Sequence, residues 1–264
     1  MIKQLLAGAL LALILFPACQ SNPGTPAPAA TTPLQFETRN FVKHYCVNDD
    51  QCADFNVFYL QFAENSPQIV RQASDLIRAR IIAGLEGNTT VPFEAALDST
   101  GTRFIDDFVR MKRENPDNTM GQDIQVTSNV LANTGKLLTV RIDFNTYTGG
   151  AHPNSASTLM SFDLTQNARE LAVADMLQDS TAVLPLLEQA YKAAKGLQAG
   201  DDIKQLLLGD IETLPLPANI GIVPEGLLFV YNNYEIAPYA VGGADILLTW
   251  DQLGQSADRK RWLE

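Results

Sequence analysis

One of the two histidines of the chain lies in a short loop, Tyr147-Thr148-Gly149-Gly150-Ala151-His152-Pro153-Asn154. An imidazole exchanges protons near neutral pH, and tyrosine and asparagine side chains bind ligands through hydrogen bonds. The paired glycines permit positive φ, and Pro153 favours an extended backbone at His152. The loop is therefore a candidate binding or acid–base site. The same residue types are common in ordinary turns, so a purely structural loop is the competing interpretation.

Two predicted strands hold this loop in place. Along the first, apolar and polar side chains alternate with the period of a half-buried strand, the apolar ones being Leu138, Val140, Ile142 and Phe144. The second strand shows the same alternation, with Met160, Phe162 and Leu164 on its apolar face. We expect a hairpin that presents Tyr147, His152 and Asn154 at a sheet edge, where functional residues on rigid scaffolds are common.

General acid–base catalysis would need a carboxyl group within hydrogen-bonding reach of His152. Glu235 and Asp143 are the candidates, and a cell-wall hydrolase with His152 as general base is the enzymatic alternative. The sequence contains no HExxH metal motif, no phosphate-binding loop and no recognisable nucleophile motif. We therefore expect no catalytic residues, no metal site and no cofactor.

The N-terminus predicts export and lipid anchoring. Lys3 precedes an apolar run, Leu5–Phe16, which is too short to span a membrane and is typical of a signal peptide, residues 1–18. Cys19 follows Ala18, as in the acylated cysteine of bacterial lipoproteins, and residues 19–34 form a proline-rich tether. The expected location is the cell envelope, anchored to a membrane by this lipid and facing the periplasm or the exterior.

Composition limits the partners. The chain carries 19 basic and 30 acidic residues, a net charge of −11, and removal of residues 1–18 would take away one further positive charge. Nucleic acid and anionic membrane surfaces would both repel such a protein, whereas a basic protein would be attracted to it.

Cys46 and Cys52 form an even pair outside the cytoplasm once Cys19 is assigned to lipid. The residues between them are polar and turn-like, and strand-like runs flank them, Phe36–Tyr45 and Phe55–Phe62. We predict a disulfide at the tip of a hairpin. A metal site made of the two thiolates with His44 is the alternative.

The remaining pattern mixes helices and strands. Helical spacing predicts a helix that begins at Ser66 as N-cap with Pro67 next, and a second at about Phe93–Glu114 that Gly101 interrupts. Further helices are expected at Leu171–Leu177, Val183–Lys195 and Asp201–Leu208, with Asp201 as N-cap. A strand and a turn at Asn133–Lys136 precede the loop hairpin. Gly226–Tyr231 is apolar on both faces, which is typical of a central strand, and Ala244–Trp250 predicts the last strand.

Two motifs together resemble a known family. These are Tyr147–Asn154 and a later block that comprises Pro224–Leu227 and Tyr234–Ala240. Over roughly Phe36 to Leu253 the chain resembles the extracytoplasmic domain shared by RsiV-type anti-sigma factors, which bind lysozyme, and the N-terminal region of PdaC-type peptidoglycan deacetylases. The resemblance implies an α+β fold of antiparallel sheets packed with helices in two joined halves, residues 35–135 and 136–264.

Departures from that family limit what can be transferred. The sequence before Cys19 is predicted to be a signal peptide, so no sigma-binding or membrane-spanning segment is expected. With His44 and His152 as its two histidines, the chain also cannot supply the metal-binding Asp/His set of the deacetylases. The expected function is a binding module that captures a lysozyme-like protein or a cell-wall (peptidoglycan) fragment. The expected binding residues are Tyr147, Gly149, Gly150, His152, Asn154, Tyr234, Glu235 and Tyr239. The competing expectation is structural: Tyr234 and Tyr239 would fasten one half to the other, with His152 hydrogen-bonded beneath them.

Overall fold

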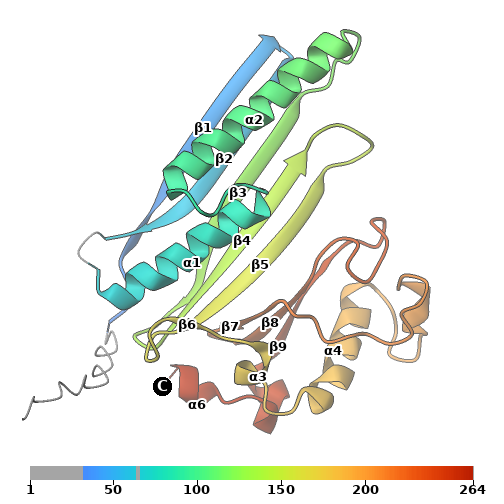
Figure 1. The fold of residues 1–264 in the computed structure, drawn as a ribbon. Helices are drawn as coiled ribbons and strands as arrows, with labels where there is room; N and C mark the ends of the chain where they lie inside the picture. The colour runs from blue at the N-terminus through green and yellow to red at the C-terminus, as the bar shows by residue number, and fades with distance from the viewer. Residues whose placement is uncertain (1–31, 64–65, 264) are drawn as a thin grey trace, which may run out of the picture.

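The computed structural model describes residues 32–63 and 66–263. The predicted signal peptide, Cys19 and most of the tether lie outside this part of the chain. No helix in the described ranges is long and apolar enough to cross a membrane. The fold is α+β, as predicted, and comprises a six-stranded mixed sheet, a three-stranded antiparallel sheet and several helices (Figure 1).

The larger sheet has the strand order β1-β2-β3-β4-β5-β6. Its strands are β1 (Phe36–Asn48), β2 (Gln51–Phe62), β3 (Gln122–Asn133), β4 (Leu137–Tyr147), β5 (Asn154–Asp163) and β6 (Arg169–Glu170). Neighbouring strands are antiparallel except β2 and β3, which are parallel. The predicted antiparallel arrangement therefore holds at the other pairs, and this one parallel pair makes the large sheet mixed. A parallel neighbour needs a long crossover, and two helices in the sequence between β2 and β3 supply it.

Those helices are α1 (Gln68–Gly84) and α2 (Phe93–Glu114), and both lie along one face of the large sheet (Figure 1). The expected cap at Ser66 is wrong, because Pro67 occupies the N-cap position and makes no side-chain cap. The expected interruption of α2 at Gly101 is also wrong. A Cβ at Gly101 would lie 3.0 Å from a carbon of the Phe55 ring, so this glycine lets the continuous helix approach β2 closely.

The smaller sheet consists of β7 (Ile220–Val223), β8 (Gly226–Tyr231) and β9 (Ala244–Thr249), with β8 in the centre as predicted. Helices α3 (Val173–Met176), α4 (Ser180–Ala194), α5 (Trp250–Leu253) and α6 (Arg259–Leu263) and the 3-10 helices η1 (Ile203–Gln205) and η2 (Gly254–Ser256) complete this part. The helix expected at Asp201–Leu208 shrinks to η1, capped by Asp202 rather than Asp201. It stops because the Leu208 N–H donates to Ile236 O, 2.9 Å away, instead of continuing the helical pattern.

Two hydrophobic cores correspond to the two sheets. One lies between the large sheet and α1 and α2, and the other between the small sheet and the C-terminal helices. Ala132 and Leu137, at the β3–β4 turn, already belong to the second core. The boundary expected at residues 135/136 falls at this turn, inside the six-stranded sheet. The first core continues past it along the chain to Ala168.

The predicted disulfide at the hairpin tip is present between Cys46 and Cys52, which are directly paired on β1 and β2. His44 and the two sulfurs lie within 4.8 Å of one another. The metal-site alternative is nevertheless wrong for this state, because disulfide sulfurs are not thiolate ligands.

Candidate functional site

The loop between β4 and β5 has the conformation that its glycines suggest. Gly149 and Gly150 have φ values of +106° and +103°, and neither has an atom within 4 Å of the place where a Cβ would lie. The glycines therefore serve the backbone turn rather than close packing. The Tyr147 hydroxyl donates to Gly150 O at 3.1 Å, and Gln122 donates to Thr148 O at 2.8 Å. These two hydrogen bonds fix the loop from both sides.

His152 lies at the end of this loop and contacts two tyrosines from the second half of the chain. Its ring stacks on Tyr239, with centroids 3.6 Å apart and planes 12° from parallel. The Tyr234 hydroxyl lies 3.1 Å from His152 Nε2, and His152 Nδ1 lies 3.0 Å from Pro153 O. A carbonyl oxygen can only accept, so Nδ1 carries a proton, and in the neutral ring Nε2 accepts from Tyr234. We call His152, Tyr234 and Tyr239 the aromatic cluster.

The segment that carries the two tyrosines is held by a half-buried lysine. Lys195, just after α4, donates from Nζ to three carbonyl oxygens, those of Val241 at 2.8 Å, Gly242 at 3.1 Å and Gly243 at 2.7 Å. Burial lowers the pKa of Lys195. One ammonium group therefore satisfies the carbonyls of this turn and fixes the loop from Asn232 to Gly243 against α4.

Tyr234 combines an unfavourable backbone with an exposed ring. Its φ is +63°, a conformation that a bulky residue adopts only at a cost of about 1–3 kcal/mol. Its side chain is nonetheless 52% exposed, whereas Ile236 and Ala237 in the same loop are buried. The backbone conformation thus directs a large aromatic ring toward solvent.

The structure brings together six of the eight predicted binding residues: Tyr147, Gly149, Gly150 and His152 on the loop, with Tyr234 and Tyr239 across from it. Asn154 begins β5 and lines a different hollow, which also contains Phe144 and lies against α1 and α2. The Glu235 carboxylate accepts from the Asn232 N–H at 2.8 Å and so caps its own loop.

Neither Glu235 nor Asp143, the expected acidic partners, forms a hydrogen bond with His152. Asp143 accepts from Arg141 Nε at 2.7 Å and from the Ser157 hydroxyl at 2.6 Å. Within residues 32–63 and 66–263, the ring nitrogens of His152 bond the Tyr234 phenol and Pro153 O, and no carboxylate takes part. The structure thus places His152 against the Tyr234 phenol, the Tyr239 ring and Pro153 O.

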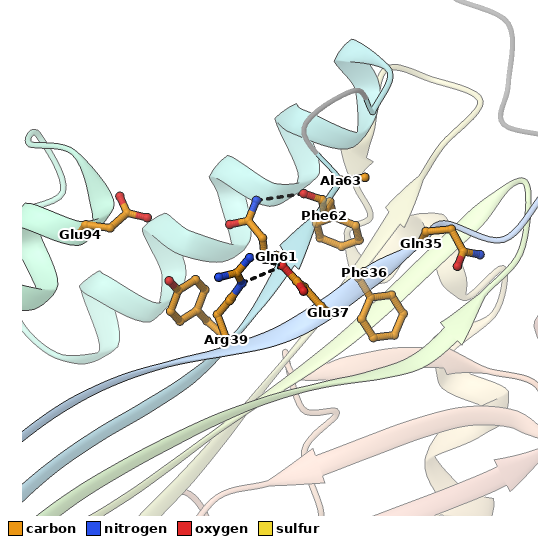
Figure 2. A pocket seen from close by; sticks show the side chains of 9 residues that line it. Gln35, Phe36, Glu37, Arg39, Gln61, Phe62, Ala63 and Glu94 are labelled. Carbon is orange, nitrogen blue, oxygen red and sulfur yellow. Dashed lines mark hydrogen bonds and ion pairs between the residues drawn. The ribbon is translucent and has the colours of Figure 1, made fainter.

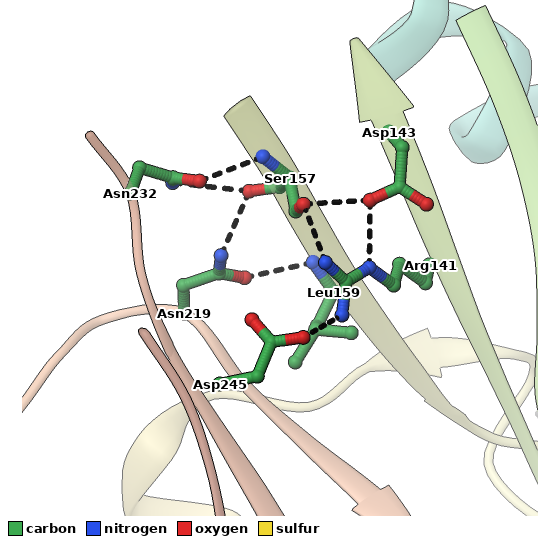
Figure 3. A network of polar contacts seen from close by, with 7 residues as sticks. All are labelled: Arg141, Asp143, Ser157, Leu159, Asn219, Asn232 and Asp245. Atoms are coloured by element: carbon green, nitrogen blue, oxygen red, sulfur yellow. Dashed lines mark hydrogen bonds and ion pairs between the residues drawn. The ribbon is translucent and has the colours of Figure 1, made fainter. Parts of the chain in front are cut away.

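A polar network that the sequence did not reveal lies between the two sheets (Figure 3). Asn232 accepts from the Ser157 N–H at 2.7 Å and donates to Ser157 O at 3.1 Å. Asn219 accepts from the Leu159 N–H at 2.7 Å and also donates to Ser157 O, at 2.8 Å. The two asparagines thus replace a neighbouring strand along the edge of β5, an arrangement that blocks further strand pairing there.

Arg141 extends this network to the small sheet. It forms ion pairs with Asp143 and with Asp245 of β9, and it donates to the Ser157 hydroxyl at 2.8 Å (Figure 3). Burial by itself would lower the pKa of Arg141, but hydrogen bonds to Asp245 and Asp143 outweigh it and raise the pKa. Residues of the network line a polar hollow of about 330 Å³ between the sheets.

A third hollow, of about 520 Å³, lies at the N-terminal end of β1 (Figure 2). Phe36, Phe62 and Tyr59 supply its apolar surface. Arg39 donates to Glu37 Oε1 at 2.7 Å across its opening. Its lining comes from residues 35–39, 59–63 and Glu94, and none of the predicted binding residues is among them.

Comparisons with known proteins agree with the fold. The family model described as "Protein of unknown function (DUF3298)" matches residues 173–251, the segment that contains α3, α4 and the small sheet. A DUF3298 family structure from Bacteroides fragilis is similar at a TM-score of 0.64 and 20% identity, covering 87% of this chain and 95% of that one. A second, from Pseudomonas aeruginosa, has a TM-score of 0.58 and 18% identity, covering 90% and 99%. No curated protein matches the sequence.

Proposed function

We propose that this protein is a binding module of the cell envelope that captures a cationic, lysozyme-like protein or a peptidoglycan fragment. The aromatic cluster would be its contact surface. The observation that carries the proposal is Tyr234, whose ring is 52% exposed on a backbone with φ +63°. Strain of this kind persists where the surrounding structure imposes it, and it concentrates at functional sites.

Three further features support this surface. Tyrosine and histidine rings supply flat contact area and polar edges with little loss of conformational entropy. The rings are already arranged, because His152 stacks on Tyr239 and bonds Tyr234, so ordering them on binding costs little. The net charge of −11 and the exposed Glu235 beside Tyr234 favour a basic partner.

Anchoring remains part of the same proposal. Acylated Cys19 and the proline-rich tether would hold the folded part away from a membrane. The Cys46–Cys52 disulfide supports an oxidising compartment outside the cytoplasm.

Isothermal titration calorimetry tests the proposal directly. The chain without residues 1–18 and with Cys19 replaced by serine is titrated with hen lysozyme and, separately, with soluble muropeptides, each at low and moderate salt. We expect binding of one of the two, lost in Tyr234→Ala and Tyr239→Ala and retained in Tyr45→Ala, which removes a 40% exposed tyrosine from β1. No heat with either ligand at either salt concentration refutes the proposal.

A further inference from the structure

A different reactive group lies at the tip of the β1–β2 hairpin. The Cys46–Cys52 disulfide has a histidine against one of its sulfurs, with His44 Nε2 3.1 Å from Cys46 Sγ. The other ring nitrogen, Nδ1, lies 2.6 Å from Asp54 Oδ1. Sulfur, imidazole and carboxylate therefore follow one another at distances of 3.1 and 2.6 Å.

Strand pairing produces this order. Cys46 is opposite Cys52 and His44 is opposite Asp54, so the two pairs are neighbours along the same face of the hairpin. The Asp54 carboxylate can only accept, so His44 Nδ1 donates to it and Nε2 is directed at the sulfur. A carboxylate that orients an imidazole against a nucleophile is the arrangement that activates thiols and hydroxyls in enzymes.

We propose that Cys46–Cys52 is a redox-active disulfide that exchanges with a dithiol, with His44 as its acid–base group and Asp54 as a positioning residue. A disulfide that only stabilises the hairpin would need the two cysteines alone. The imidazole contact instead provides what exchange requires, a group that stabilises the departing thiolate.

The reaction proceeds in two balanced steps. A thiolate of the dithiol attacks Cys52 Sγ, the Cys46–Cys52 bond breaks, and its electron pair passes to Cys46 Sγ, which takes a proton from the His44 imidazolium. Solvent then returns a proton to the His44 imidazole. The second thiol of the dithiol, as its thiolate, then attacks the mixed disulfide and displaces the Cys52 thiolate, which takes up a proton. The dithiol ends as a disulfide, and the protein gains two electrons and two protons.

Access to the disulfide is consistent with this role. The side chains of His44 and Asp54 are 55% and 42% exposed. Gly121 lies against the backbone of Cys52, where a Cβ would be 2.9 Å from Cys52 O. The two backbones therefore approach too closely for a side chain at position 121, and Cys46 and Cys52 are themselves half-buried. Asp123, paired with Asp54 on β3, lies on the same side, and burial together with the Asp54 charge raises the pKa of Asp123.

The test measures the disulfide itself. Wild-type protein, His44→Gln and Asp54→Asn are reduced by dithiothreitol at neutral pH, free thiols are trapped with a maleimide, and the reduction rate and the midpoint potential are obtained from mass spectra. Asp50→Asn is the matched control, because it removes an exposed carboxylate from the same hairpin tip that makes no side-chain hydrogen bond or ion pair within the described residues. The melting temperature of each oxidised variant verifies folding.

We expect His44→Gln to be reduced about tenfold more slowly and to have a more negative midpoint potential, because the reduced form loses its thiolate-stabilising partner. Asp54→Asn should change both quantities in the same direction by less, and Asp50→Asn should match the wild type. Equal rates and potentials in His44→Gln and wild type overturn the proposal. If His44→Gln does not fold, wild-type behaviour of Asp54→Asn overturns it instead.

Discussion

Asn232 offers the sharpest test of how the two halves are joined. Its side chain makes two hydrogen bonds to the backbone of one residue, accepting from the Ser157 N–H at 2.7 Å and donating to Ser157 O at 3.1 Å. Asn232→Ala removes both hydrogen bonds at once. The Ser157 N–H then lies unpaired on a partly buried strand edge, whereas Ser157 O keeps its bond from Asn219 at 2.8 Å.

The expected magnitude follows from these contacts. A lost hydrogen bond costs about 1 kcal/mol, and a buried donor without a partner costs about 1–3 kcal/mol. The bond to Ser157 O is partly replaced by the bond from Asn219, whereas the Ser157 N–H has no partner. Together these two losses should lower the free energy of unfolding by about 2–4 kcal/mol. For a domain of this size the melting temperature should fall by about 5–15 °C.

Differential scanning calorimetry measures the change, and hydrogen exchange locates it. The Ser157 amide should lose protection in Asn232→Ala before the amides in the centre of β4 do. Asn129→Ala is the control, since Asn129 is exposed on β3 and makes no side-chain hydrogen bond within the described residues. The reasoning is refuted if Asn232→Ala melts within about 1 °C of this control, or if the Ser157 amide stays protected.

Two further variants test the supports of the C-terminal part. Lys195→Met leaves the carbonyls of Val241, Gly242 and Gly243 without their donor. It should therefore lower the free energy of unfolding by about 3 kcal/mol. Urea unfolding measures this change, with Lys136→Met on an exposed turn as the control. Asp175 has a pKa lowered to about 2, first by the hydrogen bond from Arg169 and then by the Ala172 N–H. Because this folded-state pKa is below the value of about 3.9 in an unfolded chain, the folded protein binds fewer protons, so the stabilisation is complete above about pH 4 and is lost as pH falls through about 2. Asp175→Asn should therefore flatten the fall of stability with pH across this window, and a curve as steep as that of the wild type would contradict the assignment.

Local patterns were sufficient to predict much of the fold. The strands around the His152 loop, the continuous apolar strand β8 and the hairpin closed by Cys46 and Cys52 all follow from periodicity, turn residues and cysteine pairing. Each of these features depends on residues close together in the sequence. The parallel pairing of β2 and β3 does not, because it depends on how α1 and α2 return the chain across the sheet.

The polar network between the two sheets could not be predicted from the sequence. Asn232 and Ser157 are 75 positions apart, and nothing near either residue indicates that an amide side chain will complete a strand edge. No sequence pattern around Asn219 indicates that its side chain bonds the backbone of β5. For His152, by contrast, the structure shows the contact with Tyr234 and Tyr239 that the structural alternative expected. The exposure of Tyr234 and its positive φ are tertiary features that the motif alone could not supply.

Contact between His152 and the tyrosines is compatible with both a binding role and a structural one. Tyr234→Gly separates the two, because glycine adopts the φ of +63° without strain. If the ring is present for binding, its removal relieves backbone strain and costs the folded state little.

The decisive measurement is therefore the stability and the affinity of Tyr234→Gly, determined on the same preparation by urea unfolding and by calorimetric titration with the ligand that the wild type binds. A binding role predicts a free energy of unfolding within about 1 kcal/mol of the wild type, or above it, and an affinity at least about tenfold lower. A variant destabilised by about 2 kcal/mol or more that keeps wild-type affinity would contradict the account and make the aromatic cluster a structural fastening.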